Sequence, residues 1–561
     1  RMLPMVESGA LPFFHFDGQT IVIDDYLEVR PKAVSRIRAL VQAGKLQIGP
    51  WYVLADSFLV SGESLIRNLE IGTRTAERYG PVLDVGYLPD QFGHCAQLPQ
   101  ILAGFGFNTA VLWRGVPRDI PRNRFIWEAL DGSSVTTLYL PYGYSNGAWL
   151  PLDDPDALLA KLRDIVEREA DFADGSPILV LQGTDHTEPD ERLPERLREI
   201  RKAGGPSFEI GTLKGYLVRL SESPAEGIAR HRGELRSPAR AHLLPGVTSA
   251  RTWIKQRDFA NCYALERLAD PLAALATFEG ASDGHHAFLD LAWRLELQNQ
   301  PHDSICGCSI DQVHEDMRYR FDQAGLIAEQ VIRSASRELL AGKNDRDTRL
   351  AVFNATFSPT ALVSGEADMP RPGARYWAIG PDGRRIATVV EELDTTRSDR
   401  CRLSFVADNL EQAGFTYFRL EGDDVGAPGA LNAPSRVDAI ANEFYRLSPS
   451  ARGVAIEDRK SGRCIELYFE DDGDRGDEYN FDPVAGTSPV VQPATMAARV
   501  VEAGAVRSRM MINLTYELPD ALTPDRRERA SDTTELRIEV VATLFGGLDR
   551  VDLTARVTNQ A

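Results

Sequence analysis

Cysteine is scarce in this sequence, and long apolar runs are missing. The 561 residues include six cysteines, scattered between Cys95 and Cys464, which are too few and too dispersed for a disulfide framework. No stretch of 18 apolar residues occurs, so no transmembrane helix is predicted. Internal repeats and low-complexity tracts are also missing. These absences indicate a globular chain without a disulfide scaffold or a membrane-spanning helix.

Positive charge is in deficit. Lys and Arg total 63 against 82 Asp and Glu, which gives a formal net charge of −19. This balance disfavours nucleic acid or an anionic membrane as a partner, because both carry negative charge. No signal peptide is visible, but the chain opens on Arg1 rather than Met, so we expect its true start to be missing. We expect a cytoplasmic protein and leave homo-oligomerisation open.

The length predicts about three domains, because one hydrophobic core does not grow to this size. Within residues 1–236, short apolar runs alternate with helix-like segments, which favours a mostly parallel sheet flanked by helices. The predicted strands are Phe13–Asp17, Leu46–Ile48, Asp84–Leu88, Thr109–Trp113, Val135–Leu140, Ile178–Leu181 and Phe208–Ile210. The predicted helices are Pro31–Ala43, Ser64–Tyr79, Ala96–Phe105, Ala157–Asp171 and Arg192–Lys202.

Two further regions have different periodicities. Residues 237–343 repeat apolar side chains at three- and four-residue steps, as in Met317, Phe321 and Ala324, and predict a helical bundle. Residues 344–561 alternate at period two between turn residues and predict one or more β-sandwiches. The alternation continues from Arg550 to Val557, so we expect the last β-domain to be incomplete.

Asp90 lies where a predicted strand ends. The apolar run Val82–Leu88 stops before Pro89, which has no N–H to offer a strand ladder. Substrates bind at the carboxyl edge of α/β sheets, because the loops there are held by rigid strands and open to solvent. Asp90 is therefore a candidate reactive carboxylate. An Asx turn or a helix cap is the alternative.

Six segments, taken in chain order, resemble family 38 of the glycoside hydrolases, the α-mannosidases. Gly86–Gln100 is similar to the stretch around the family's nucleophile. The other matching segments are Gly49–Tyr52 with Ser61–Ser64 and Arg67–Leu69, Leu112–Gly115, Gly183–His186, Asn299–Ser304 and Gly476–Phe481. Together they look most like the bacterial branch of the family.

The resemblance implies a fold and an activity. The fold is an α/β + α + β multidomain chain: a seven-stranded α/β barrel whose first strand precedes residue 1, then a helical bundle, then a β-sandwich. The activity is retaining hydrolysis of terminal α-mannosyl residues, which needs one ionised carboxyl and one protonated carboxyl. Asp90 resembles the nucleophile and Asp185 the acid/base residue. The residues that resemble substrate-binding positions are Phe92, Arg114, Tyr144, Asp303 and Tyr479, with Tyr142 nearly as good as Tyr144.

Zinc is the cofactor that the resemblance implies. His302 corresponds to a zinc-binding histidine, and the nucleophile Asp90 is itself a ligand in the family, where the ion also holds two sugar hydroxyls. The family's other two ligands, a His and an Asp two residues apart, would precede residue 13. His15 and Asp17 share that spacing, but we reject them, because the residues after them continue as the family's second strand does. We expect the zinc site of this chain to be empty or incomplete.

Two other functions remain open, and a third is disfavoured. A hydrolase of mannosylglycerate, or of its phosphorylated form, should carry extra Arg or Lys near Arg114. A metal-dependent deacetylase needs an Asp-Asp pair and two spaced His, which we do not find. A catalytically impaired glycan-binding protein would retain the mannoside site without turnover.

Two smaller features are ambiguous. Asp56 and Glu63 either support the site or position the turn at Gly49–Tyr52. Cys306 and Cys308 are separated by one residue, which is not the usual metal-ligand spacing.

Overall fold

The computed structural model describes residues 2–206, 208–222, 227–281, 284–341, 349–368, 375–392, 400–423 and 438–558. The chain divides into two units. The N-terminal unit is Arg1–Leu339 together with Glu478–Asn480, and the C-terminal unit is Leu340–Asp477 together with Phe481–Ala561. Each unit is described by itself. The predicted domain boundary at residues 343 and 344 lies outside the described residues.

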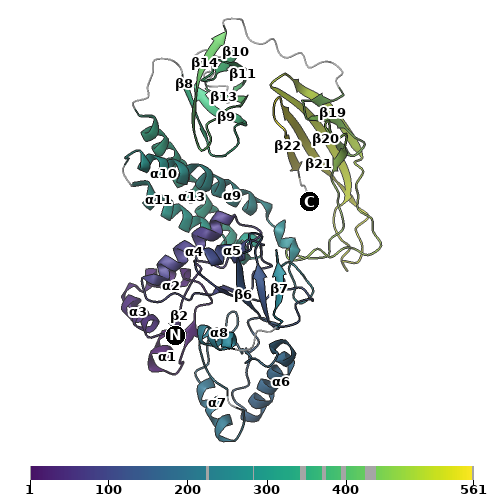
Figure 1. Cartoon of the computed structure of the whole chain (residues 1–561). Coiled ribbons are helices and arrows are strands. Elements are labelled where there is room, and N and C mark those ends of the chain that lie inside the picture. Colours follow the sequence, from purple (N-terminus) through teal and green to yellow (C-terminus); the bar gives the residue numbers. More distant parts are fainter. Residues whose placement is uncertain are drawn as a thin grey trace. The chain divides into compact units, whose positions relative to one another are not determined.

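A five-stranded sheet organises the first part of the N-terminal unit (Figure 1). Its order is β3 (Gly86–Leu88), β4 (Thr109–Leu112), β6 (Ser134–Tyr139), β5 (Arg124–Glu128) and β7 (Ala229–Arg232). The pairs β3–β4 and β4–β6 are parallel, and β5 runs antiparallel to β6. A separate parallel pair joins β1 (Phe14–His15) to β2 (Leu46–Gln47). The parallel strands end at one edge, where the site is assembled.

The predicted seven-stranded barrel is not confirmed, because the strands of the described residues form no closed barrel. Two predicted strands, Ile178–Leu181 and Phe208–Ile210, do not form strands of any sheet. The side chain of Asn146 takes the place of a strand partner: it donates to the carbonyl oxygen of Leu179 and accepts from the N–H of Leu181, each at 2.8 Å. Conversely, β5 and β7 were not predicted.

Helices surround this sheet where the periodicity places them. They are α3 (Val34–Gln42), α4 (Gly62–Glu77), α5 (Leu98–Gly104), α6 (Pro155–Ala173) and α7 (Leu193–Lys202), with α1 (Met2–Ser8), α2 (Ile21–Val29) and α8 (Leu213–Glu222) in addition. The side chain of Ser61 caps α4 by accepting the N–H of Ser64 at 2.9 Å. Residues 24–27, which were expected to continue like the family's second strand, lie in α2. In α2 the apolar side chains recur with the three- to four-residue spacing of a helix, and not at every second residue as in a strand.

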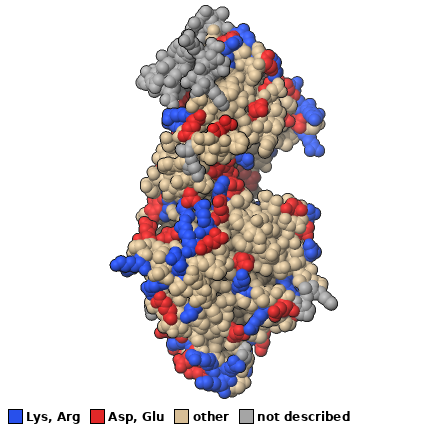
Figure 2. Space-filling view, turned by 60° about the vertical axis from the view of Figure 1, so that its left-hand side comes forward, with Lys and Arg blue, Asp and Glu red and all other residues tan. Residues whose placement is uncertain are grey.

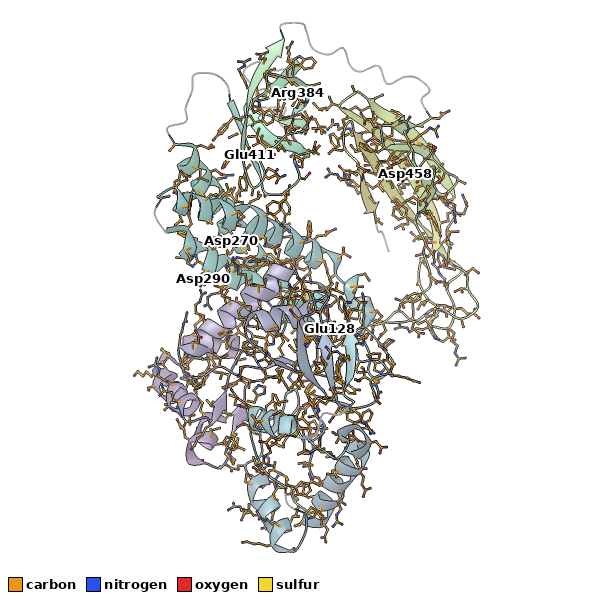
Figure 3. All side chains as sticks on the ribbon, viewed as in Figure 1. Glu128, Asp270, Asp290, Arg384, Glu411 and Asp458 are labelled. Atoms are coloured by element: carbon orange, nitrogen blue, oxygen red, sulfur yellow. The ribbon has the colours of Figure 1, made fainter. Side chains whose placement is uncertain are left out.

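The predicted helical region is confirmed. It contains α9 (Thr252–Tyr263), a π-helix (Ala264–Ala269), α10 (Asp270–Phe278), α11 (Gly284–Leu297), α12 (His302–Cys306) and α13 (Asp311–Leu340). The buried side chains that it shares with the turn after β2 and with α4 include Tyr52, Val53, Ile71, Leu265, Trp293 and Val331. Ion pairs add to this contact, because Arg67 and Arg74 of α4 pair with Asp270 and Asp290, both labelled in Figure 3.

The C-terminal unit is built from antiparallel sheets, as the alternating pattern predicts. One core, which includes Leu403, Phe405 and Phe418, is shared by a four-stranded and a three-stranded sheet formed from β8 (Arg349–Asn354) to β14 (Gly414–Asp423). A second core is shared by two four-stranded sheets formed from β15 (Ile440–Ala441) to β22 (Val551–Thr558).

Lys and Arg side chains are interspersed with Asp and Glu on the face that Figure 2 presents. In the part of the chain that the structure describes, no helix is both long enough and apolar enough to cross a membrane.

Candidate active site

Asp90 follows β3, and Arg114 from the end of the neighbouring strand β4 holds it in place. Nε of Arg114 donates to Oδ1 of Asp90 at 2.8 Å, and Nη2 lies 2.6 Å from the same oxygen. Nη1 donates to the carbonyl oxygen of His242 at 2.7 Å, and the guanidinium stacks 3.9 Å from the ring centre of Trp113. Burial raises the pKa of Asp90, but hydrogen bonding to His302 and the charge of Arg114 outweigh it and lower the pKa. Asp90 is therefore ionised.

Tyr144 joins Asp90 to the second candidate carboxyl. Its hydroxyl oxygen lies 3.2 Å from Oδ2 of Asp90 and 2.8 Å from Oδ2 of Asp185. The phenol has a single proton, so it donates to one carboxyl at a time and is free to accept from the other when that one is protonated. Burial and the charge of Asp90 raise the pKa of Tyr144, which keeps the hydroxyl protonated. The alternative candidate, Tyr142, is exposed and donates to the carbonyl oxygen of Arg168.

His302 begins α12 and faces Asp90. Its backbone N–H donates to the carbonyl oxygen of Leu54 at 2.8 Å, and Nδ1 lies 3.1 Å from the same oxygen. That contact places the Nδ1 proton toward Leu54 and leaves Nε2 3.8 Å from Oδ2 of Asp90 and 3.8 Å from Oδ1 of Asp303. Burial lowers the pKa of His302, but the two carboxylates outweigh it and raise the pKa to about 9.

Aromatic and sulfur-containing side chains enclose this group. The ring of Phe92 meets the ring of His302 edge to face, with centres 5.6 Å apart. Oδ1 of Asp303 lies 3.5 Å from Sγ of Cys308, which is also hydrogen-bonded to the side chain of Tyr479. Tyr479 belongs to the short segment that packs with the N-terminal unit, and its carbonyl oxygen accepts the N–H of Gly246 at 2.8 Å. All eight residues singled out by the resemblance therefore lie in one unit.

Asp56 contacts both α12 and the segment that follows Asp90. It is buried, accepts the N–H of Phe58 at 2.8 Å, and lies 3.7 Å from Sγ of Cys306 in α12. A hydrogen bond from the backbone of Phe92 ties it to the segment after Asp90. The turn that Asp56 was alternatively expected to position is instead held by Asn68, whose Oδ1 accepts the N–H of Tyr52 at 2.8 Å.

Asp17 is the site residue that sequence reasoning undervalued. It is hydrogen-bonded to Tyr87, and it interacts electrostatically with His302, Asp185 and Asp90. Surrounding protein atoms raise the pKa of Asp17 to about 7, although its side chain is still open to solvent. A usable signal was present: like Asp90, Asp17 lies two residues after the carboxyl end of a short parallel strand.

The donor groups fit a metal only in part. Asp90 and His302 offer an oxygen and Nε2 close together, with Asp303 beside them, whereas zinc normally takes three or four protein ligands. His15 does not complete the set as it stands, because its Nε2 accepts the N–H of Gly18 at 3.2 Å. A different group, Asp258, Cys262 and Glu296 of the helical region, places three ligand atoms within 4.8 Å of one another.

Comparisons with known proteins give these residues a context. Residues 10–234 match the model of the glycosyl hydrolases family 38 N-terminal domain, and residues 243–339 match that of the alpha mannosidase middle domain. A protein of Halalkalibacterium halodurans, named provisionally as a mannosylglycerate hydrolase, is 36% identical across 98% of this chain and 69% of its own length. Alpha-mannosidase 2C1 of Homo sapiens is 27% identical across 62% of this chain and 32% of its own length. The crystal structure of an alpha-mannosidase from Enterococcus faecalis V583 has a TM-score of 0.87 at 27% identity, covering 100% of this chain and 70% of that one.

Proposed function

Because the chain belongs to glycoside hydrolase family 38, we propose that it cleaves terminal α-mannosyl residues with retention of configuration, with Asp90 as nucleophile and Asp185 as acid/base. The observation that carries this proposal is the hydroxyl of Tyr144, which contacts a carboxyl oxygen of each aspartate. Its two contacts limit the separation of the two Oδ2 atoms to about 6 Å. That limit admits the roughly 5–5.5 Å of retaining enzymes and lies below the roughly 6.5–9.5 Å of inverting ones.

The reaction proceeds in two steps. In the first, Oδ2 of Asp90, the oxygen that Arg114 leaves free, attacks the anomeric carbon while protonated Asp185 gives its proton to the departing glycosidic oxygen. In the second, ionised Asp185 takes a proton from water, and the resulting hydroxide equivalent attacks the anomeric carbon and releases Asp90. Tyr144 accommodates both protonation states of Asp185, because it donates to a carboxylate and accepts from a carboxyl.

Asp90 and His302 are the residues that we propose to hold zinc. The contact from Nδ1 of His302 to Leu54 fixes the imidazole so that Nε2 is available as the ligand atom. A bound zinc ion supplies Lewis acidity and a template for sugar hydroxyls. Phe92 and Tyr479 supply aromatic surface at the site, and Asp303 supplies an acceptor for a sugar hydroxyl.

The two candidate substrates, mannosylglycerate and a neutral α-mannoside, differ in the charge of the aglycone. The relative named for mannosylglycerate suggests an anionic aglycone, which would need a free cationic side chain. In the described part of the chain, the cationic groups in contact with Asp90 are Arg114 and His302, and all three nitrogens of Arg114 are already engaged. Several carboxyls, those of Asp17, Asp185 and Asp303, lie nearby. This charge distribution favours a neutral α-mannoside as the substrate.

Hydrolysis of 4-nitrophenyl α-mannoside and of mannosylglycerate, each with zinc added, tests the proposal. We expect faster turnover of the neutral mannoside, and proton NMR of the first product should show α-mannose before mutarotation. Initial release of β-mannose would contradict the retaining mechanism. Calorimetric binding of a mannoside without any turnover would instead favour a glycan-binding protein.

A further inference from the structure

A second cluster of chemistry-bearing residues lies in the helical region, apart from Asp90 and His302. Asp258 and Cys262 lie on α9 and Glu296 on α11, with 3%, 4% and 0% of their surfaces exposed. Sγ of Cys262 lies 3.8 Å from Oδ2 of Asp258. The proposed glycosidase mechanism uses none of these groups.

The side chain of Gln300 is directed into the same cluster. Its Nε2 donates to Oδ1 of Asp258 at 2.8 Å and to Oγ of Ser64 at 3.1 Å, and it lies 3.7 Å from Sγ of Cys262. Gln300 is fully buried. The cluster therefore collects side chains from α4, α9, α11 and the segment just before α12.

In the described structure the carboxyls of this cluster are not held in ion pairs, and Arg257 acts on Glu296 only through its charge, which lowers the pKa of Glu296. In the part of the chain that the structure describes, no Lys, Arg or His forms an ion pair with Asp258 or Glu296. Burial raises the pKa of Asp258 to about 6 and that of Glu296 well above its ordinary range. The charge of Asp258 raises the pKa of Glu296 further, whereas hydrogen bonding to Glu296 lowers the pKa of Asp258. A buried pair of this kind needs either a shared proton or a cation.

Hydrogen-bond acceptors without a partner help to decide between a shared proton and a bound cation. Oε1 of Glu296 and Oε1 of Gln300 are buried without a hydrogen-bond partner, and both polar atoms of the neighbouring Asn299 are also unpaired. One shared proton satisfies a single acceptor, whereas a cation serves several at once. Buried orphan acceptors are rare in folded proteins and point to a missing water or ion. Two of them beside a buried acidic pair that no ion pair neutralises in the described structure favour a cation.

We propose that Asp258, Cys262 and Glu296 bind a structural divalent cation, zinc by preference, at a site separate from Asp90 and His302. The Cys262 sulfur selects zinc over calcium or magnesium, and its proton passes to solvent as the metal–sulfur bond forms. Donor atoms within 4.8 Å of one another need to move inward by less than about 1 Å to reach zinc–ligand distances. A half-turn of the Gln300 amide offers its oxygen as the fourth ligand, which gives the number that structural zinc takes.

A metal at this site would link helices of the helical region and stabilise their packing. It joins α9 to α11, and Gln300 is two residues before His302, so the metal would stabilise the segment that presents the imidazole to Asp90. The proposal does not depend on the glycosidase activity. A chain without turnover should still bind the metal.

Metal content of the whole chain tests this site. After purification and dialysis against metal-free buffer, zinc is measured by mass spectrometry in the wild type and in the variants Cys262→Ala, Glu296→Gln and His302→Ala. Glu169→Gln and Cys401→Ala are matched controls, because they alter a buried Glu and a buried Cys elsewhere. We expect one tightly held zinc that His302→Ala and both controls retain and that Cys262→Ala and Glu296→Gln lose, with at least a ten-fold fall in affinity.

Cobalt substitution tests whether the Cys262 thiolate is a metal ligand. It also keeps the proposal testable if Cys262→Ala folds poorly. The wild type loaded with Co²⁺ should show a thiolate-to-cobalt absorption band, and the milder variant Cys262→Ser should lack it while keeping the wild-type circular dichroism. Zinc should also raise the Tm of the wild type but not that of Cys262→Ser. A folded wild type that holds no zinc, or holds only zinc that His302→Ala removes, would overturn the proposal and leave a proton-sharing pair or a trapped water.

Discussion

Arg114 holds Oδ1 of Asp90 with two nitrogens, Nε at 2.8 Å and Nη2 at 2.6 Å. The other oxygen, Oδ2, is left facing Tyr144 and His302. This division gives the two oxygens of one carboxylate different tasks. One oxygen is anchored by a cation, and the other is directed toward the position where a sugar would bind.

The variant Arg114→Gln should move the acid limb of the activity profile to higher pH. Burial pushes the pKa of Asp90 up, and the loss of the guanidinium would leave less to oppose it. A nucleophile must be ionised, so activity is lost as pH falls through the pKa of Asp90, and a higher pKa brings that loss at a higher pH. We also expect kcat/KM to fall about 10- to 100-fold, the effect of losing a charge-assisted hydrogen bond.

A pH profile of kcat/KM checks this prediction, with Arg114→Lys as the graded control. Lysine keeps the charge but cannot place two donors on one oxygen, so it should give a smaller shift of the acid limb. An acid limb at the same pH in all three proteins would contradict the role assigned to Arg114.

Removing the hydroxyl of Tyr144 should break the link that it forms between Asp90 and Asp185. In Tyr144→Phe we expect kcat/KM to fall about 10- to 100-fold, because a hydrogen bond to a charged group is lost. Tyr142→Phe is the matched control, since that hydroxyl donates to the carbonyl oxygen of Arg168 and contacts neither aspartate in the described structure. Steady-state kinetics of both variants decide the point. If kcat/KM fell equally in the two variants, the contact of the Tyr144 hydroxyl with Asp90 and Asp185 would not explain the loss.

The pKa of His302 predicts how the metal-free chain responds to alkaline pH. Burial lowers this pKa, but Asp90 and Asp303 outweigh it and raise it to about 9, above the ordinary 6.5. The folded chain then holds a proton that the unfolded chain releases, so the contribution is complete below pH 6.5 and disappears as pH rises through 9. It amounts to at most about 3 kcal/mol.

Urea unfolding between pH 6 and 10, with a chelator present, measures this contribution. The wild type should lose free energy of unfolding across that window, and His302→Gln should lose less. Parallel curves for the two proteins would show that the histidine is not held as a cation.

Gly72 should tolerate no side chain. It lies on α4 where a Cβ would overlap the carbonyl oxygen of Pro50 and the backbone of Trp51 and Tyr52. Backbone atoms cannot move aside without shifting the turn, so Gly72→Ala should lower the free energy of unfolding by about 3 kcal/mol. Gly104→Ala is the control: it lies at the end of α5 with open space around it and should be neutral or slightly stabilising. Urea titration of both variants gives the comparison.

Much of the fold could be predicted from sequence because its elements have clear periods. The three- and four-residue steps at Met317, Phe321 and Ala324 correspond to a buried face of α13, and the alternation over Met510–Tyr516 corresponds to alternate burial in β20 (Arg507–Pro519). The run Ile178–Leu181 was wrongly predicted to be a strand of the sheet, because an apolar run alone does not show which group its backbone is hydrogen-bonded to. That partner is a side-chain amide, Asn146, and not another strand.

The candidate site residues could be named from the sequence, but the contacts that connect them could not. Asp90, Asp185 and His302 lie on segments with distinctive motifs, and the structure brings all three to one place through Tyr144 and a direct approach of Nε2 to Oδ2. The carbonyl oxygen of Leu54 orients His302, and a backbone atom leaves no trace in a sequence pattern. Asp17 was judged only as a metal ligand, so its place near Asp90 and Asp185 went unnoticed.

Covalent trapping tests the central claim most directly. The zinc-loaded chain is incubated with 5-fluoro-α-mannosyl fluoride, and the labelled peptide is sequenced by mass spectrometry. We predict a stable mannosyl ester on Asp90, in the peptide that contains Gly86–Gln100, and none in Asp90→Asn. A label on Asp185 or on any other residue, with Asp90 unmodified, would contradict it.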